Sequence, residues 1–153
     1  MPDSALTIAL SHLGYSLDSL RSLPLFARDD DPIHPEVREW CLEAFYMHAR
    51  VVADFFVKMP ETDYTARSYV TEWKLSDDEA RSVLDHAWRV ATQQVAHLSR
   101  KRVMGEDDLP EQTDHRGLVR ITAAADSAAV HFVADYRQQH PRSLTSVETL
   151  LLP

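Results

Sequence analysis

The stretch that decides the fold is Ser76–Arg102, SDDEARSVLDHAWRVATQQVAHLSRKR. It opens with Ser-Asp-Asp-Glu, which is typical of a capping box: the Ser76 side chain accepts from the backbone amide of Glu79, and the glutamate reaches back to the serine amide. Small and apolar residues then recur every three or four positions, which is the spacing of one helical face. That predicted face consists of Ala80, Leu84, Ala87, Ala91, Val95 and Leu98, with Trp88 beside it. We therefore predict a long amphipathic helix over 76–103, ended by the glycine and the proline that follow.

The composition favours helices in a single domain. A chain of 153 residues can bury about 68–70% of its unfolded surface, which is enough for a core without metals or disulfides. The chain is 44% hydrophobic and 26% charged and has three glycines, so it offers few positions for tight β-turns. We predict one helical domain over residues 1–153.

Prolines separate the other predicted helices, because a proline interrupts a helix interior. The leucines of 4–22 are spaced by four and three residues, which predicts a helix there, although Gly14 weakens it by about 1 kcal/mol relative to alanine. The fold we predict is an all-α, antiparallel four- or five-helix bundle in which 4–22 packs across a frame of longer helices. That frame consists of the helices over 36–58, 76–103 and 114–139. The tail, 142–153, is expected to be docked, disordered or part of an oligomer contact.

Two frame helices have apolar faces that follow from their spacing. For the first frame helix the predicted core face is Val37, Cys41, Ala44, His48, Val51 and Phe55, flanked by Trp40, Phe45, Val52 and Phe56. For the last helix, capped by Thr113 or Asp114, the face is Leu118, Ile121, Ala125, Ala128, Phe132 and Tyr136. On an apolar face His48 needs a hydrogen-bond partner, so it is either a satisfied core histidine or a site residue. Arg50 and Asp54 lie four residues apart and can pair across one turn.

Charge and cysteine content exclude several classes of protein. With 24 acidic and 16 basic residues the formal net charge is −8, which disfavours binding of nucleic acid over a broad surface. Any contact with nucleic acid is therefore expected to be local, and Arg100-Lys101-Arg102 is the only run of three basic residues. The single cysteine, Cys41, excludes an internal disulfide and a multi-cysteine zinc site, and it is expected to be a small core residue. Because there is no signal-peptide pattern and no apolar run of membrane length, we expect a cytoplasmic location.

The polar side of the 76–103 helix carries the candidate site. Residues spaced by three, four, four and three form one ridge beside the apolar face: His86, Arg89, Gln93, His97 and Arg100. Histidine can act as an acid or a base near neutral pH, and arginine can hold a phosphate through two parallel hydrogen bonds. The ridge therefore has the groups for metal-independent phosphodiester cleavage or for phosphate binding. The other interpretation is that it is the ordinary polar face of an amphipathic helix.

Two stretches of the chain resemble a known family. They are Leu42–Phe56, LEAFYMHARVVADFF, and Arg89–Arg102, the second half of the helix quoted above. Together they look like a group of bacterial helical proteins that are similar to the HEPN superfamily, including its abortive-infection-like members. The resemblance covers about residues 36–104. It implies a helical bundle, commonly dimeric. In ribonuclease members it also implies an arginine followed, after four to six residues, by a histidine at the dimer interface.

The family motif maps onto this chain with two departures. His97 matches the family histidine, but seven residues separate it from Arg89. Arg81 and His86 do have four residues between them, with a serine where the family more often has asparagine, aspartate or histidine. For a catalytic member, the resemblance implies that His97 is the acid or base and that Arg89 or Arg100 stabilises the phosphate. The residues expected to bind the substrate are His86, Gln93, Lys101, Arg102 and His48.

The resemblance thus implies a HEPN-like homodimer that binds or cleaves RNA without a cofactor, in a defence or toxin setting. The alternative is a non-catalytic helical interaction or scaffold protein, in which His48 and His97 are structural. A third hypothesis is a metal site formed by Glu43, His48 and His97, if the long helices bring these residues together. The chain lacks the Glu-x-x-His spacing of di-iron bundles and any His-Glu-x-x-His motif, which disfavours this third hypothesis.

Overall fold

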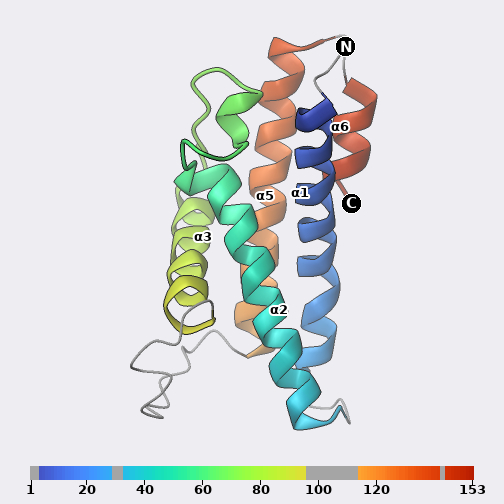
Figure 1. Ribbon diagram of the computed structural model, residues 1–153, viewed down its shortest axis with the longest axis vertical. Coiled ribbons are helices and arrows are strands. Elements are labelled where there is room, and N and C mark those ends of the chain that lie inside the picture. The colour runs from blue at the N-terminus through green and yellow to red at the C-terminus, as the bar shows by residue number, and fades with distance from the viewer. Residues whose placement is uncertain (1–3, 29–32, 96–113, 142–143) are drawn as a thin grey trace.

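The computed structural model describes residues 4–28, 33–95, 114–141 and 144–153. Successive long helices run in opposite directions and pack side by side, and the short last helix lies against the first (Figure 1). The helices are α1 (Ser4–Ser22), α2 (Pro35–Ala53), α3 (Asp78–Val90), α5 (His115–Gln139) and α6 (Leu144–Leu151). The described parts of the chain contain no β-strand, and none of their helices is long and apolar enough to cross a membrane. The prediction of an all-α helical bundle is confirmed.

The caps of α3 and α5 are aspartates. The Asp77 side chain accepts from the backbone amide of Ala80 at 2.9 Å, so the cap of α3 is Asp77 and not the predicted Ser76. The Ser76 hydroxyl instead makes a hydrogen bond of 2.9 Å with Nδ1 of His131 on α5. Serine and aspartate are comparable helix caps, so sequence preference does not choose between Ser76 and Asp77. The packing of α3 on α5 makes the choice, because it engages Ser76 with His131 and leaves Asp77 to cap the helix. Asp114, one of the two predicted caps of α5, accepts from a backbone amide of its first turn.

The core is built around Phe132 of α5. The rings of five other residues lie with their centroids between 5.5 and 6.0 Å from that of Phe132: Phe55, Phe56, Tyr69, Trp73 and Tyr136. The buried Trp73 also donates from Nε1 to the carbonyl oxygen of Phe56 at 3.1 Å. This bond joins the loop between α2 and α3 to the end of α2, so the loop is part of the core.

The predicted core faces of α3 and α5 are confirmed where the structure describes them. The buried residues of these faces are Ala80, Leu84, Ala87, Ala91, Leu118, Ile121, Ala125, Ala128 and Phe132. Tyr136 is partly buried and packs against the same core. The side chains of Val95 and Leu98 lie outside the described residues, as does the predicted C-terminal end of that helix. Within the described part, α3 ends at Val90 and is followed by a π-helical turn, Ala91–Val95.

The predicted core face of α2 is right only in part. Phe55 is buried, as are the predicted flanking residues Phe45, Val52 and Phe56, whereas the rest of the face is rotated away from the observed one. The side chains that α2 buries are Phe45, Tyr46, Ala49, Val52 and Ala53. Val37 and Val51 are exposed instead. Cys41 and His48 are only partly buried, so Cys41 is not the core residue that we expected. The physical reason is that α2 is apolar on two opposite sides, and spacing alone does not say which side faces the bundle.

At its C-terminal end α2 continues into a π-helical turn, Asp54–Lys58. The wider turn lets two consecutive aromatic side chains, Phe55 and Phe56, both enter the core. Arg50 and Asp54 form the predicted ion pair, with Nε and Oδ2 3.7 Å apart. The segment closes at Met59, whose φ of 49° is left-handed and whose amide donates to the carbonyl oxygen of Asp54.

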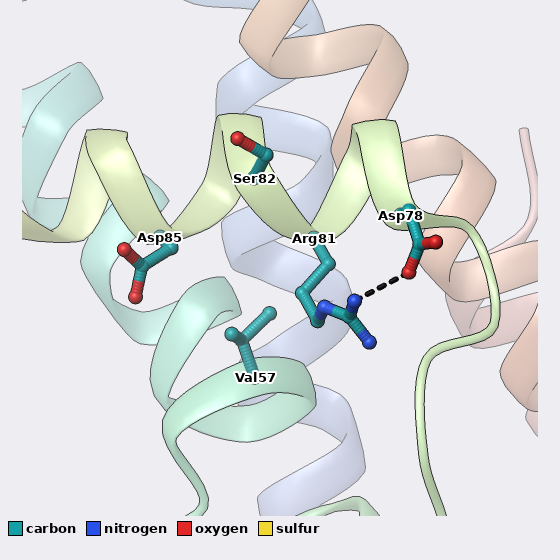
Figure 2. Close-up of a pocket in the computed structure, with 5 residues that line it drawn as sticks. All are labelled: Val57, Asp78, Arg81, Ser82 and Asp85. Carbon is teal, nitrogen blue, oxygen red and sulfur yellow. Dashed lines mark hydrogen bonds and ion pairs between the residues drawn. The ribbon is translucent and has the colours of Figure 1, made fainter.

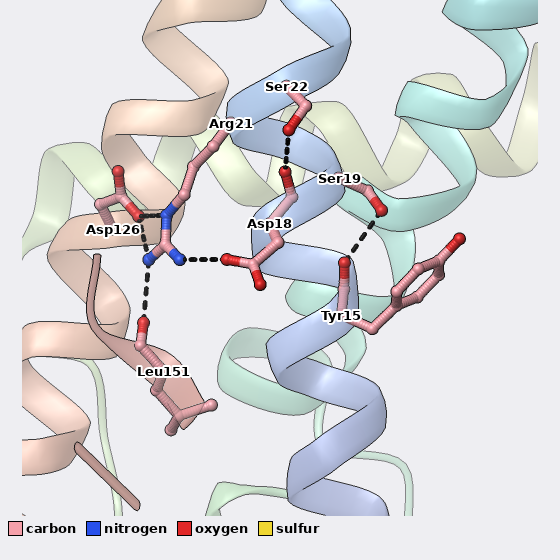
Figure 3. Close-up of polar contacts among 7 residues, drawn as sticks. All are labelled: Tyr15, Asp18, Ser19, Arg21, Ser22, Asp126 and Leu151. Carbon is pink, nitrogen blue, oxygen red and sulfur yellow. Dashed lines mark hydrogen bonds and ion pairs between the residues drawn. The ribbon is translucent and has the colours of Figure 1, made fainter. Parts of the chain in front are cut away.

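The C-terminal tail is docked on the bundle through α6, which packs against α1 and α5 (Figure 1). A Cβ atom at Gly14 would lie 2.5 Å from the carbonyl oxygen of Leu150, so the glycine allows α1 and α6 to approach closely. Leu151 is fully buried. The Arg21 guanidinium of α1 donates to the carbonyl oxygen of Leu151 and to the Asp126 carboxylate of α5, both at 2.8 Å (Figure 3). Within the described residues 144–153, α6 therefore packs on the bundle.

Candidate functional site

The described part of the predicted ridge lies on the solvent side of α3. His86 and Arg89 are exposed on the helix, and Gln93 is exposed in the π-helical turn that follows. A π-helical turn is wider than an α-helical one, so Gln93 departs from the line that regular α-helical spacing predicts. Four predicted site residues lie outside the described part of the chain: His97, Arg100, Lys101 and Arg102.

Arg89 already has a carboxylate partner. Its guanidinium pairs with Asp85 one turn earlier on α3, and Asp85 also accepts from Lys58, the last residue of the π-helical turn that follows α2. The Lys58 hydrogen bond, followed by that of Arg89, holds the pKa of Asp85 below its ordinary value, so this carboxylate is anionic at neutral pH. The Arg89 side chain remains 61% exposed. Arg89 can therefore turn to an anionic ligand, but binding would exchange one exposed ion pair for another.

A shallow pocket of about 280 Å³ lies between the start of α3 and the end of α2 (Figure 2). Its lining residues are Val57, Asp78, Arg81, Ser82 and Asp85. The Arg81 guanidinium lies over this pocket and pairs with Asp78 (Figure 2). His86 is not one of the lining residues, because five positions along an α-helix turn a side chain about 140° away from that of Arg81. Arg81 and His86, the pair with the family interval, are thus not brought together around one cavity.

A polar cluster beside this pocket joins α2 to α3. Trp88 Nε1 donates to Oδ1 of Asp54 at 2.7 Å, and Nζ of Lys58 lies 4.5 Å from the centroid of the Trp88 ring. Burial raises the pKa of Asp54, while the Trp88 hydrogen bond and Arg50 act in the opposite direction. Sequence reasoning found only the Arg50–Asp54 pair, because Asp54, Lys58, Trp88 and Asp85 meet only when the two helices pack. Since each charged group here has a partner, the cluster holds α2 on α3.

His48 is a partnered histidine between α1 and α2. Its Nδ1 lies 3.2 Å from the Ser16 hydroxyl oxygen, and its ring meets that of Tyr15 edge-on at a centroid separation of 5.3 Å. Burial lowers the pKa of His48, which favours the neutral imidazole. Both contacts are with α1, so His48 does not join His86 and Arg89 in one site. This arrangement fits the structural interpretation of His48.

A second serine–histidine contact, which sequence reasoning missed, lies between α3 and α5. It is the 2.9 Å hydrogen bond of Ser76 with His131, whose positions are 55 residues apart in the chain. The neighbouring Asp77 is occupied as a cap, and its pKa is lowered first by the backbone amide of Ala80 and then by the Ser127 hydroxyl. The contact is exposed and lies outside the pocket described above. It therefore lacks the enclosed surroundings that a nucleophilic serine site needs.

The described residues do not form a metal site. No group of three or more histidine, cysteine, aspartate or glutamate side chains within them is placed to hold a metal ion. The hypothetical site of Glu43, His48 and His97 includes a residue outside the described part, so it stays a hypothesis.

Comparisons with known proteins give no match: no family model, no curated protein and no solved structure matches this chain. The resemblance to the HEPN superfamily therefore rests on the two stretches 42–56 and 89–102 alone.

Proposed function

We propose that this chain is a HEPN-like helical domain that binds RNA through the exposed side of α3 and the residues that follow it, and that it acts as a homodimer. The observation that carries the proposal is the exposure of His86, Arg89 and Gln93, which precede the basic run at 100–102. Arginine and lysine bind RNA phosphates, and unstacked bases can stack on histidine or on an arginine plane. Because the net charge is −8, the RNA surface is local and its affinity falls steeply with salt.

In the catalytic form of this proposal, His97 transfers the proton and Arg89 or Arg100 stabilises the charge on the phosphate. Arg89 leaves Asp85 to do so, and its exposure permits that movement. Cleavage then needs no added metal. A defence or toxin role follows from the family resemblance, which includes abortive-infection-like members, and we place that role in the cytoplasm.

Fluorescence anisotropy with a labelled single-stranded RNA at low salt tests the binding surface. Arg89→Ala is expected to raise the Kd about threefold, because the phosphate contact replaces the exposed ion pair with Asp85 and its net gain is that of one exposed pair. Arg120→Ala is the matched control: the Arg120 side chain of α5 is 62% exposed and pairs with Glu79, as Arg89 is 61% exposed and pairs with Asp85. Equal losses in the two variants would contradict the proposed surface.

A cleavage assay without added metal tests the catalytic form. His97→Ala is expected to abolish cleavage while the RNA affinity and the circular dichroism spectrum stay close to those of the wild type. Undiminished cleavage by this variant would overturn the role of His97 and leave the binding proposal in place.

A second candidate function, a non-catalytic helical interaction domain, is favoured by the outer side of α2. Trp40, Met47 and Val51 are exposed there, which is typical of a protein-binding surface. This function predicts that the purified chain neither binds nor cleaves RNA at any salt concentration. It also predicts that substitution of Trp40 abolishes partner binding while the fold is retained.

A further inference from the structure

The side of α2 that faces away from the bundle is apolar. Five residues on it are spaced by three, four, three and four positions: Val37, Trp40, Ala44, Met47 and Val51. We call these five residues the α2 seam. Trp40 is 63% exposed, Val51 44%, Met47 42% and Val37 39%. Tyr15 of α1, 65% exposed, extends the apolar surface, since its ring contacts His48 of α2.

The pattern of the α2 seam indicates what covers it. A helix that is apolar on two opposite sides is typically buried on both, and α2 already buries one side in the bundle. Alternating spacings of three and four are those of the a and d positions of a coiled coil, where the covering element is another helix. The seam therefore fits a helix with the same periodicity.

We infer that the α2 seam is a self-association surface, on which the α2 helices of two copies of this chain pack antiparallel about a two-fold axis. The inference rests on the homodimer proposed above and names its surface. In an antiparallel pair an a position of one helix faces a d position of the other. In the register that we infer, Trp40 faces Val51 of the second copy, and Ala44 faces its Met47. Each of these layers then joins a larger side chain to a smaller one, which fills the space between the helices, while Val37 lies at the end of the contact opposite Asp54 of the second copy.

Charges beside the seam select a second copy in this orientation. In the same register Glu43 lies beside Arg50 of the second copy, and symmetry forms this opposite-charge pair twice. In a parallel pair Glu43 would lie beside His48 and Arg50 beside Phe55, so no carboxylate–guanidinium pair would form. Both residues also have contacts within one chain, that of Arg50 being a long ion pair with Asp54 at 3.7 Å, and the pair with the second copy would replace these contacts.

Sedimentation equilibrium of the full chain tests the α2 seam. The wild type is expected to be dimeric at micromolar concentration, and Met47→Glu is expected to raise the dimer Kd at least about tenfold. Val130→Glu, at a residue of α5 that is 51% exposed and outside the seam, is the matched control and is expected to leave the Kd unchanged. Because both side chains are exposed, circular dichroism is expected to show the wild-type fold in both variants.

The possible failures are distinguishable. If neither Met47→Glu nor Trp40→Ser changes the dimer Kd, the α2 seam is not the dimer interface. The proposed homodimer then stands and must form through another surface. A wild type that stays monomeric up to about 100 µM overturns the seam and the homodimer together. RNA binding is measured separately by anisotropy.

A charge exchange tests the orientation. Glu43→Arg and Arg50→Glu are each expected to raise the dimer Kd by about tenfold, because each change breaks both symmetry-related pairs and one exposed ion pair is worth about a factor of three. The double variant is expected to return towards the wild-type Kd, because the antiparallel pair re-forms with its charges exchanged. A double variant that binds no better than either single variant overturns the antiparallel register.

Discussion

Gly14→Ala tests the close contact between α1 and α6. On an exposed helix this change would stabilise the protein by about 1 kcal/mol, since alanine is the better helix former. Here the new Cβ would lie 2.5 Å from the carbonyl oxygen of Leu150, so α6 must shift. Overpacking of this kind costs about 1–3 kcal/mol, and a shift that weakens the hydrogen bond from Arg21 to Leu151 costs about 1 kcal/mol more. After subtraction of the propensity gain, we expect a net loss of about 1–3 kcal/mol.

Urea denaturation followed by circular dichroism measures this loss in the free energy of unfolding. In a thermal melt, each kcal/mol that is lost is expected to lower the Tm by about 2–4 °C for a chain of this size. Gly117→Ala, in the first turn of α5, is the control for helix propensity and is expected to be neutral or stabilising. A Gly14→Ala protein as stable as the wild type would refute the reasoning, because it would mean that α6 does not press on α1 at Gly14.

Three further substitutions test individual contacts. Asp77→Ala is expected to lower the free energy of unfolding in urea by more than Ser76→Ala does, because Asp77 is the cap and Ser76 is not; the reverse order would contradict the assignment. Burial lowers the pKa of His48 in the folded chain below its ordinary 6.5. As the pH falls through 6.5, the unfolded chain therefore binds more protons than the folded chain, and the free energy of unfolding decreases. His48→Gln should flatten that part of the stability–pH curve, and an unchanged slope between about pH 7.5 and 5.5 would exclude the effect. Trp88→Phe removes the donor to the half-buried Asp54 and is expected to cost about 1–3 kcal/mol in the same urea assay, whereas no measurable loss would show that water replaces the indole.

Much of the fold follows from spacing because most of the helices bury one side only. The faces of α3 and α5 could be written from the sequence, since their small and apolar residues repeat along a single stripe. Asp114 was recognisable as a cap because it precedes the stripe of α5 directly. At the start of α3 the sequence offers Ser76 and Asp77 side by side, and only the contact of Ser76 with His131 separates them.

The α2 helix shows the limit of such reasoning. Its outer residues, Val37 to Val51, have the same helical periodicity as a core face, so the spacing predicted a real apolar stripe but assigned it to the wrong side. The spacing of apolar residues also did not predict the π-helical turn at Asp54–Lys58. This turn changes the directions in which Phe55 and Phe56 point, but their positions in the sequence are the same as in a regular α-helix. Three residues of that predicted stripe, Val37, Ala44 and Val51, belong to the inferred dimer surface, and the structure adds the exposed Trp40 and Met47 to it.

The sequence predicts which residues of the candidate site are exposed, but not which residues they contact. The exposure of His86 and Arg89 follows from the amphipathic pattern of α3. Their partners do not, since the Lys58–Asp85–Arg89 cluster depends on how α2 packs beside α3. Periodicity within one helix carries no information about the charges that a neighbouring helix brings.

The salt dependence of RNA binding tests the proposed function most directly. A plot of log Kd against log salt concentration, from about 50 to 200 mM, is expected to be steep for the wild type because bound phosphates release counterions. Arg89→Ala is expected to reduce the slope by about 1, as one phosphate contact is lost, while Arg120→Ala leaves it unchanged. A slope that Arg89→Ala does not alter, or an absence of binding over the whole range, would contradict an RNA-binding surface on α3.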